Sequence, residues 1–287
     1  PAATDVSLGK SATMSSDASL VFSMATMTPV GEGASMSSGT SMVFPMAERI
    51  VLGASASMSS GTSLTVNTIH SSLSVEIALG TDATVSSGTS MSIQGARSVS
   101  MGDSTTLSSE SIDITTQTLT LSAGASITSD NLGASSFGVG CAPQSTVRVG
   151  YQSSPGAGHG GKGGTAADGC TSSQTTYGDP DAPVTEGGGA TDGGRGGGVI
   201  RLEVSDTLRM GENSRISSEG ESHVTYGGGA GGSVWITASV VVVAKTSVLS
   251  VAGGNGGKYE SGTYYSNSGG GGGGRLLVEI GSAETDS

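Results

Sequence analysis

A unit of about 22 residues recurs through the first half of the chain, and few folds are compatible with so short a period. Each unit opens on an apolar residue that is usually followed by Gly, and then small or apolar residues alternate with polar ones. Successive units start 22, 22, 27, 22 and 20 residues apart. The starts are Leu8 (LGKSATMSSDASLVF), Val30 (VGEGASMSSGTSMVF), Leu52 (LGASASMSSGTSLTV), Leu79 (LGTDATVSSGTSMSI), Met101 (MGDSTTLSSESIDI) and, more faintly, Leu121 (LSAGASITSDNL).

The alternation within a unit predicts strands rather than helices. Ala34 and Met36 flank Ser35, and Met42 and Phe44 follow after a turn. Apolar residues at every second position, in short pieces broken by Ser-Gly or Gly-Thr, are typical of short strands joined by tight turns. Gly and Thr also lower helix propensity in every window.

A unit of this size cannot bury its apolar face alone, so neighbouring units must stack. We therefore predict an all-β fold, a parallel β-helix (β-solenoid) whose coils pair with one another at about 4.8 Å. Leucine-rich repeats have a similar period but need Leu-x-x-Leu-x-Leu followed by Asn, which this sequence lacks. The residues that open the units should form one inward-facing core ladder: Leu8, Val30, Leu52, Leu79, Met101 and Leu121.

The second half is rich in Gly and also repeats, with longer units. GGRGGGVIRLEV (193–204), GGAGGSVWITA (228–238) and GGGGGGRLLVEI (269–280) align, which predicts equivalent strand positions at Val199, Val234 and Leu276. A second element, SRISSEG (214–220) and SVLSVAG (247–253), recurs at an offset of 33. We therefore divide the chain into regular solenoid repeats (1–136) and a Gly-rich solenoid continuation with long loops (137–287).

Polyglycine before a strand needs a physical reason, because Gly loses more conformational freedom on ordering than any other residue. Lack of a side chain supplies it: where segments from successive coils run side by side, only Gly lets the backbones come close. Strict Gly-X-Y periodicity is missing and the chain has only 7 Pro, which excludes collagen.

Cys141 and Cys170 bracket 30 residues made mostly of Gly, Ser, Thr, Pro and Ala. A disulfide here would remove loop-closure entropy of about 3 to 4 kcal/mol from the unfolded chain. We favour that bond, and hence an oxidising compartment, over two free thiols. Zinc would require more ligands at closer spacing.

The sequence does not assemble a catalytic constellation, and we predict that the protein is not an enzyme. Gly158-His159-Gly160 resembles the Gly-His-Gly element of polygalacturonases, but their Asn-Thr-Asp, Asp-Asp and Arg-Ile-Lys elements are missing. Asp179, Asp181, Glu186 and Asp192 lie in a Pro- and Gly-rich loop, without rigid elements to hold two carboxylates across a scissile bond. We interpret them as solvated loop acids.

No metal or cofactor is predicted. His70, His159 and His223 have no other His or Cys within metal-ligand spacing, and His159, beside Lys162, is expected to contact local backbone. Gly9 to Ser11 reads Gly-Lys-Ser, but Thr4 stands where a phosphate loop needs its first Gly. Calcium stays open, because acidic loops with Gly turns supply hard oxygen ligands, although the Gly-Gly-x-Gly-x-Asp array of calcium-binding β-rolls is not repeated.

Charge and hydropathy exclude other partners. The net charge of −12 repels phosphate backbones and anionic membranes, so nucleic-acid binding is not expected. The longest aliphatic stretch, Val240 to Ala244, is too short to span a bilayer, so membrane insertion is not expected either. No basic segment and apolar core follow Pro1, which is what we expect of a processed or trimmed product.

Aromatic residues gather near the C-terminus. Tyr259, Tyr264 and Tyr265 lie in KYESGTYYSN (258–267), which is the best candidate for an exposed contact surface and, with Trp235, for a sugar-binding platform. Trp235 follows a Gly tract inside a predicted strand, so we expect it to pack against the coil instead.

The order of the Gly-rich motifs carries a resemblance to a known family. GHGGKGG (158–164) and YGDPDAP (177–183), followed by the three Gly-rich strand segments, resemble the Gly-rich extracellular β-helix proteins of heterokont algae, oomycetes and other protists, and among these the shaft glycoproteins of mastigonemes, the tubular flagellar hairs. This resemblance covers roughly residues 137 to 280. It implies a secreted structural polymer subunit without catalytic residues. Because no Asn-x-Ser/Thr sequon is present, any glycans would be O-linked.

From the repeats and the resemblance together we expect a structural subunit of an extracellular filament or surface appendage. It would assemble with itself and with other filament subunits by stacking of solenoid ends, which expose unpaired backbone and apolar interior. The alternative is a binding module: an adhesin, or a carbohydrate- or ice-binding surface rod whose partners are glycans or ice. A polysaccharide lyase or hydrolase is a third, less favoured class.

Overall fold

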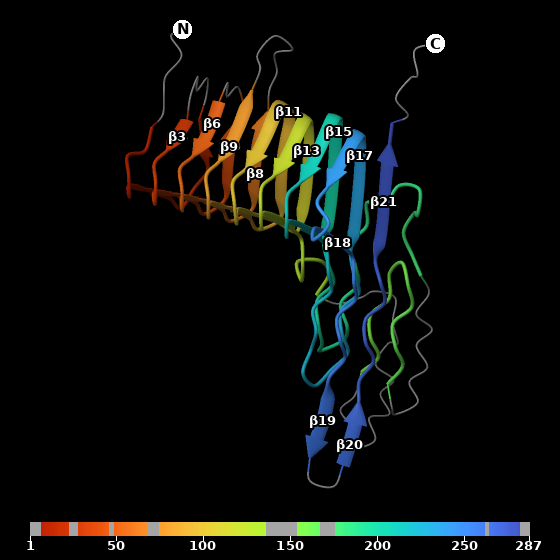
Figure 1. The fold of residues 1–287 in the computed structure, drawn as a ribbon. Helices are drawn as coiled ribbons and strands as arrows, with labels where there is room; N and C mark the ends of the chain where they lie inside the picture. The colour runs from red at the N-terminus through yellow and green to blue at the C-terminus, as the bar shows by residue number, and fades with distance from the viewer. Residues whose placement is uncertain are drawn as a thin grey trace, which may run out of the picture.

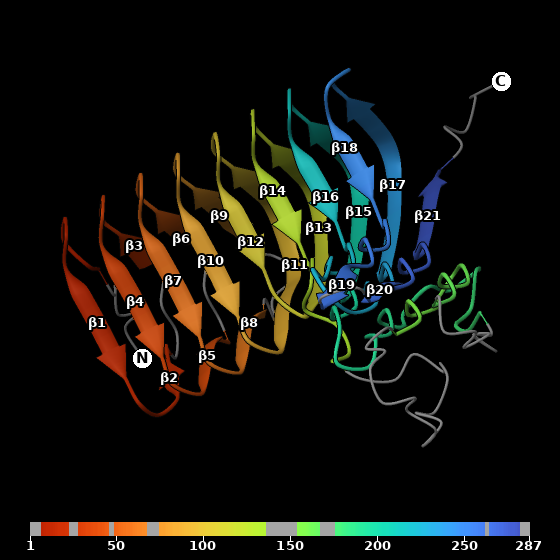
Figure 2. The same ribbon diagram turned by 90° about the horizontal axis from the view of Figure 1, so that it is seen from below.

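The structure is a computed structural model, and it describes residues 7–22, 28–45, 49–67, 75–135, 154–166, 176–261 and 264–281. Among these residues every regular element is a β-strand. Two parallel sheets lie face to face, and the chain passes from one to the other in each coil (Figure 2). The predicted parallel β-solenoid is therefore confirmed.

The narrow sheet takes one short strand from each coil. Its strands follow chain order and all pair in parallel. They are β1 (Thr13–Ser16), β4 (Ser35–Ser38), β7 (Ser57–Ser60), β10 (Thr84–Ser87), β12 (Thr106–Ser108), β14 (Ser126–Thr128), β16 (Arg215–Ser217) and β18 (Val248–Ser250).

The wide sheet has two arms, because β11 pairs with β8 through its first residues and with β9 through its last. The first arm contains β2 (Leu20–Val21), β5 (Ser41–Phe44), β8 (Ser63–Asn67) and β21 (Arg275–Ile280). The second arm contains β3 (Thr28–Val30), β6 (Arg49–Leu52) and β9 (Glu76–Leu79). Four long strands run through both arms: β11 (Ser90–Met101), β13 (Ser111–Leu121), β15 (Val199–Met210) and β17 (Ser233–Val243).

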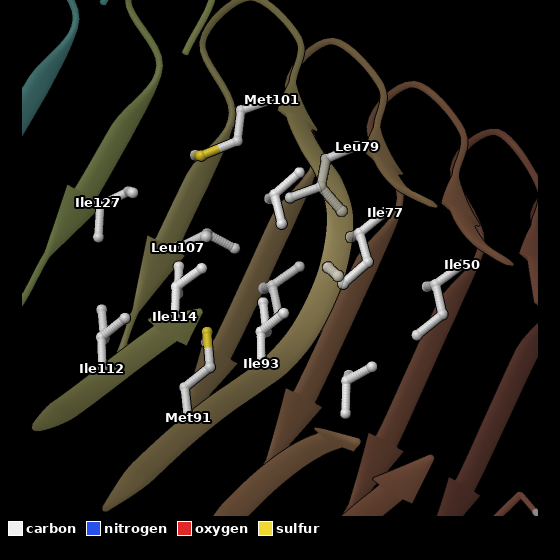
Figure 3. Close-up of a cluster of buried hydrophobic side chains, with 14 of the residues drawn as sticks. Ile50, Ile77, Leu79, Met91, Ile93, Met101, Leu107, Ile112, Ile114 and Ile127 are labelled. Carbon is white, nitrogen blue, oxygen red and sulfur yellow. The ribbon is translucent and has the colours of Figure 1, made fainter. Parts of the chain in front are cut away.

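The core lies between the sheets and is built from columns of equivalent side chains. In β8 the burial alternates strictly, with Leu64 and Val66 inside, as the two-residue period of a strand requires. Leu64 pairs in register with Met91, and Met91 with Ile112, so apolar side chains stack coil upon coil (Figure 3). Ile, Leu, Val and Met fill most of this interior, which contains no described aromatic pair other than the stacked rings of Phe22 and Phe44.

The repeated Ser-Ser-Gly-Thr-Ser motif forms the corner between the narrow sheet and the first arm. Its second serine, at Ser38, Ser60 and Ser87, is buried. The hydroxyl of Ser60 is shared between the carbonyls of Thr40, one coil earlier, at 2.8 Å and Ser63, in its own coil, at 2.7 Å. Ser38 and Ser87 repeat this arrangement, so at each corner a buried hydroxyl joins a carbonyl of the preceding coil to a carbonyl of its own coil.

The glycine of the same motif is required by space. A Cβ built on Gly61 would overlap the carbonyl oxygen of Gly39 in the preceding coil, and one on Gly88 would overlap that of Gly61. The Gly61 N–H donates to the Ser38 carbonyl at 2.9 Å, which holds the two corners in this close contact.

The opposite corner turns through one residue in the left-handed region. In the turn that begins at Gly53, Ser55 has φ 55° and the Ala56 N–H donates back to the Gly53 carbonyl at 3.2 Å. Equivalent positions in other coils have φ between 55° and 67°: Ser11, Gly33, Asp82, Ser104, Gly124 and Asn213. The Gly-x-x-Ala spacing of the repeat is therefore a turn signature.

Residues 129–198 separate β14 from β15, and those of them that the structure describes form an excursion without strands. The described parts of this excursion, with the Gly-rich loops after β16 and β18, form a projection beside the coils of the C-terminal half (Figure 1). We call it the Gly-rich layer (residues 129–135, 154–166, 176–198, 218–232 and 251–274). Because β13 pairs with β15 and β14 with β16, the two sheets continue across the division near residue 136.

Backbone hydrogen bonds outside any strand hold most of the Gly-rich layer together. The Gly271 N–H donates to the Gly254 carbonyl at 2.8 Å, and the Gly254 N–H donates to the Gly229 carbonyl at 2.8 Å. A Cβ on Gly271 would overlap the carbonyl oxygen of Gly229. Neither residue has a positive φ, so close approach, and not backbone conformation, demands Gly here.

Candidate functional site

The predicted core-ladder residues form one continuous row in the second arm. Leu8 bridges to Val30, and the row continues in register through Leu52, Leu79, Met101 and Leu121. All six are at most 7% exposed. Beyond the predicted residues, the row extends through Met210 to Val243 in β17.

This row ends at an open end of the solenoid. Met210 is 3% exposed, whereas Val243, one coil later, is 47% exposed. Leu276 and Ile280 of β21 are 44% and 60% exposed, although Val234, the partner of Leu276, is 0% exposed. Inward side chains of the last coil therefore present an apolar surface, which we call the open end (Val241, Val243, Leu249, Val251, Leu276, Val278 and Ile280).

The open end also presents backbone. β18 is the terminal strand of the narrow sheet, and β21 is the terminal strand of the first arm. Because β21 pairs only with Ser233–Ala238 of β17, the second arm stops one coil earlier, and Ser239–Val243 has no described strand beside it on that side. Such edges are templates for pairing with another chain.

Of these end residues, Leu276 was singled out from the sequence as a strand position, but exposure of the group was not predicted. The sequence contains a signal from which two of them could be predicted. Adding the offset of 33 between the two Gly-rich units to Leu208 and Met210 gives Val241 and Val243 as the equivalent core positions of the next coil. Recognising them as exposed required knowing that no further coil follows in the described chain.

One predicted alignment in the Gly-rich strands is wrong by one residue. Val199 pairs with Ser233, and it is Ile200 that pairs with Val234 and, through it, with Leu276. The physical reason is the two-residue period: Ile200, Leu202 and Val204 point inward, so matching Val199 to Val234 would turn that set outward. The three tracts end at equivalent positions, Gly198, Gly232 and Gly274, but Ser233 and Arg275 stand between the tract and the first apolar residue of the later strands, so matching the first apolar residues shifted the alignment by one.

The aromatic residues do not form one platform. Tyr259, Tyr264 and Tyr265 lie in a hairpin formed by β19 (Lys258–Ser261) and β20 (Tyr264–Asn267), at the far tip of the Gly-rich layer (Figure 1). Their side chains are outside the described part of the structure. Trp235 lies on the outer face of β17, far from that tip.

Trp235 is held by polar neighbours on the outer face of the wide sheet. The guanidinium carbon of Arg201 lies 5.1 Å from the Trp235 ring centroid. The Trp235 Nε1–H donates to Glu279 Oε2 at 2.8 Å, and the Thr237 hydroxyl donates to the same oxygen at 3.1 Å. Trp235 therefore packs against the neighbouring coil on its outer face, since its place between the inward residues Val234 and Ile236 turns it away from the core.

His159 is fully buried in the Gly-rich layer, in contact with distant residues. Its Nδ1 lies 2.8 Å from the Gly231 carbonyl oxygen and its Nε2 lies 2.9 Å from the Thr185 hydroxyl, while its ring packs on Tyr177 at 4.8 Å between centroids. Arg275 donates to the Tyr177 carbonyl at 2.8 and 3.0 Å. The expected local backbone contact is present, because the His159 N–H donates to the Gly161 carbonyl at 3.0 Å, but the ring itself is held by the distant Gly231 and Thr185.

Burial sets the ionisation of this cluster. It lowers the pKa of His159, an effect that the charge of Arg275 reinforces and backbone hydrogen bonds oppose. Burial, with the charge of Glu186, raises the pKa of Tyr177 to about 12. A neutral His, a neutral Tyr and a Thr hydroxyl, each with a structural partner, fix the layer; they offer no exposed nucleophile or base.

The loop acids and the cysteines complete the predicted candidates. Asp179, Asp181 and Asp192 are exposed, and the Asp179 carboxylate accepts a hydrogen bond from the Asp181 N–H, which is a turn contact. Burial raises the pKa of Glu186. Within the described residues no group of three or more His, Cys, Asp or Glu side chains is placed to hold a metal ion. Cys141 and Cys170 lie outside the described residues.

The outer face of the narrow sheet is made of hydroxyl residues. From β1 to β14 every outward position is Ser or Thr, in two columns: Thr13, Ser35, Ser57, Thr84, Thr106 and Ser126, and Ser15, Ser37, Ser59, Ser86, Ser108 and Thr128. The first column ends where Arg215 and Val248 follow Ser126, whereas the second continues through Ser217 and Ser250. Figure 1 shows this sheet nearly edge-on and close to flat.

Comparison of the chain with protein-family models, with curated proteins and with solved structures found no match. Within the described residues no helix is long and apolar enough to cross a membrane. The chemistry of this protein must therefore be argued from its own surfaces.

Proposed function

We propose that this chain is a structural subunit of an extracellular filament or surface appendage, and that it assembles through the ends of its solenoid. The observation that carries the proposal is the open end, where the apolar columns of the core reach solvent at Val243, Leu276 and Ile280. Partners in this reading are further copies of the chain and other filament subunits.

Two properties of the fold support a mechanical role. Each coil is held to the next by parallel backbone ladders along both sheets, so the rod is reinforced along its whole described length. A contact between unlike ends of a rod does not close on itself, and it therefore propagates into an open filament. The resemblance to mastigoneme shaft proteins and the expected Cys141–Cys170 disulfide agree with an extracellular location but do not carry the proposal.

The test is assembly of the purified chain, followed by sedimentation velocity and negative-stain electron microscopy. We expect filaments or end-to-end oligomers whose formation is lost in Val243→Asp, because a carboxylate would have to be buried in the contact. Val242→Asp is the matched control: Val242 is the adjacent residue, 42% exposed, but it follows Arg209 on the outer face.

The two variants separate the outcomes. Loss of assembly in Val243→Asp but not in Val242→Asp supports the proposal, provided that both keep the far-ultraviolet dichroism of the parent. A parent chain that stays monomeric over the whole concentration range, or two variants that assemble equally well, would refute assembly through this end.

The hydroxyl columns favour a second candidate function, an ice-binding surface rod. Hydroxyls repeat at about 4.8 Å between coils and at about 6.8 Å along each strand, on a flat face without charge. Such an array can order a layer of water that matches an ice lattice. Crystalline polysaccharide fits less well, because no described aromatic residue lies on this face to stack on sugar rings.

Thermal hysteresis and ice recrystallisation assays test the second candidate. We expect Ser59→Tyr, at the centre of the array, to abolish activity, and Ser92→Tyr, at an outward position of the wide sheet, to leave it intact. An inactive parent protein contradicts ice binding, and retention on cellulose, chitin or a glycan array would instead favour the adhesin.

A further inference from the structure

We infer that the open end receives the N-terminal coil of a second copy of this chain, in a single register. Leu8 of the second copy lies over Val243, Thr13 over Val248 and Leu20 over Leu276. This inference rests on the proposed function and specifies its partner and its contact.

The register follows from the columns of the core. Leu8 begins the column that ends at Val243, and Leu20 begins, through Met42 and the intervening coils, the column that ends at Leu276. Met14 and Leu249 stand at the two ends of the inward column of the narrow sheet. A second copy placed in this register repeats the contact that every pair of neighbouring coils already makes.

The shapes of the two ends also match. At the open end the first arm ends on β21, whereas the second arm ends on β17, because β21 has no counterpart beside the second half of β17. At the N-terminal end the first arm starts late: Leu8 and β1 precede β2 in the described chain, and β2 is the terminal strand of that arm. The strand that projects at one end therefore fills the position missing at the other.

The stacked edges are compatible in hydrogen bonding and in side chains. β1 and β18 are both edge strands of the same parallel sheet, so β1 of the second copy can extend the ladder in the same direction. Thr13, Met14 and Ser15 would face Val248, Leu249 and Ser250, an outward, inward, outward pattern on both sides. Burial of Val243 and Leu276, which are 47% and 44% exposed, removes apolar interior from water at about 25 cal/mol per Å², whereas Leu8, already 7% exposed, adds little to this gain.

One charged pair makes this register testable. Lys10 occupies the turn position of Glu32 one coil later, where the two side chains form an ion pair at 2.9 Å. Glu212 and Lys245 occupy the same turn position in the last two coils, because the offset of 33 residues that relates Met210 to Val243 also relates Glu212 to Lys245. In the inferred register Lys10 of one copy thus lies near Lys245 of the other, and two like charges oppose association.

Lys245→Glu should therefore strengthen association, by about two- to tenfold in the apparent dissociation constant. An effect of net charge alone has the opposite sign, because the change takes the net charge from −12 to −14. Arg97→Glu, an exposed position in β11 with the same change in charge, is the matched control and should not strengthen association. Sedimentation velocity at low salt measures all three proteins.

Cysteine cross-linking tests the register directly. Thr13→Cys with Val248→Cys places the two Cα atoms at the spacing of adjacent parallel strands, about 4.8 Å, within disulfide range. In Thr13→Cys with Ser250→Cys the offset of two residues takes them beyond about 7 Å. After mild oxidation of assembled protein we expect a ladder of covalent oligomers on a non-reducing gel for the first pair only, with the parent chain, which keeps Cys141 and Cys170, as background.

The outcomes distinguish failure of the inferred register from failure of the proposed function. Filaments that form without cross-linking of the Thr13 and Val248 pair, or with equal cross-linking of both pairs, overturn the register and leave the proposed function standing. A Lys245→Glu chain that assembles more weakly than its parent overturns it as well. Absence of any end-to-end assembly in the parent overturns both.

Discussion

Two glycines of one hexaglycine run, Gly271 and Gly273, should respond in opposite ways to the same substitution. A methyl group at position 271 would overlap the Gly229 carbonyl oxygen, whereas the nearest atom to a Cβ at position 273 is the Val251 carbonyl oxygen at 4.0 Å. Both are in the last Gly-rich tract before β21, and neither has a positive φ. They therefore isolate the effect of space from that of backbone conformation.

The magnitudes follow from the contacts. At Gly271, overpacking costs about 1–3 kcal/mol, and displacement of the segment weakens two backbone hydrogen bonds, Gly271 to Gly254 and Gly254 to Gly229, of about 1 kcal/mol each. We expect Gly271→Ala to lower the free energy of unfolding by about 2–5 kcal/mol. Gly273→Ala should raise it by about 0.4–1 kcal/mol, because Ala restricts the unfolded chain.

Urea denaturation followed by far-ultraviolet dichroism measures both changes, and native-state hydrogen exchange over residues 227–232 and 252–257 reports the Gly-rich layer separately from the sheets. Faster exchange confined to Gly271→Ala is the expected pattern. Equal changes in the two variants, within about 0.5 kcal/mol, would falsify the view that close backbone approach selects Gly in this layer.

Three further outcomes are expected. Ser60→Ala should destabilise the protein by about 1–2 kcal/mol, because the Thr40 and Ser63 carbonyls lose their shared hydroxyl donor; urea denaturation measures this, and no change would mean that water replaces the hydroxyl. Met91→Ala removes a fully buried side chain and should cost about 2–5 kcal/mol in the same assay, so a loss below 1 kcal/mol would contradict the packed core. The folded pKa of His159 lies below its ordinary 6.5, so the stability that depends on its neutral form is fully present above pH 6.5 and is lost as the pH falls through the lowered pKa. His159→Gln should flatten this part of the profile of stability against pH, and a parent protein that becomes more stable on acidification would contradict the prediction.

The regular coils could be read from the sequence because each local signal agrees with the global fold. The apolar residue that opens each unit, from Leu8 to Leu121, marks a buried column, and the period places these residues one above another. The Ser-Ser-Gly-Thr-Ser motif predicted a turn, and the structure explains two of its residues. The hydroxyl of the second serine bonds two carbonyls, and the glycine leaves room for the backbone of the neighbouring coil.

The Gly-rich half was only partly predictable, because glycine carries no side-chain pattern from which register can be read. The tracts before β15 and β17 end at equivalent glycines, but the first residue after the tract is Val199 in one strand and Ser233 in the other, and matching the first apolar residues produced the wrong match of Val199 to Val234. The contacts of His159 with Gly231 and Thr185 join segments 72 and 26 residues apart without any periodic signal. No pattern in the sequence predicts that these three residues are in contact.

Stacking one coil per repeat means that the length of this molecule changes only in whole steps. Duplicating or deleting one unit of about 22 residues would move the two ends of the rod by about 4.8 Å and leave every other contact in place. Tandem duplication of one unit in the gene would therefore lengthen the rod by a fixed step and leave its cross-section unchanged.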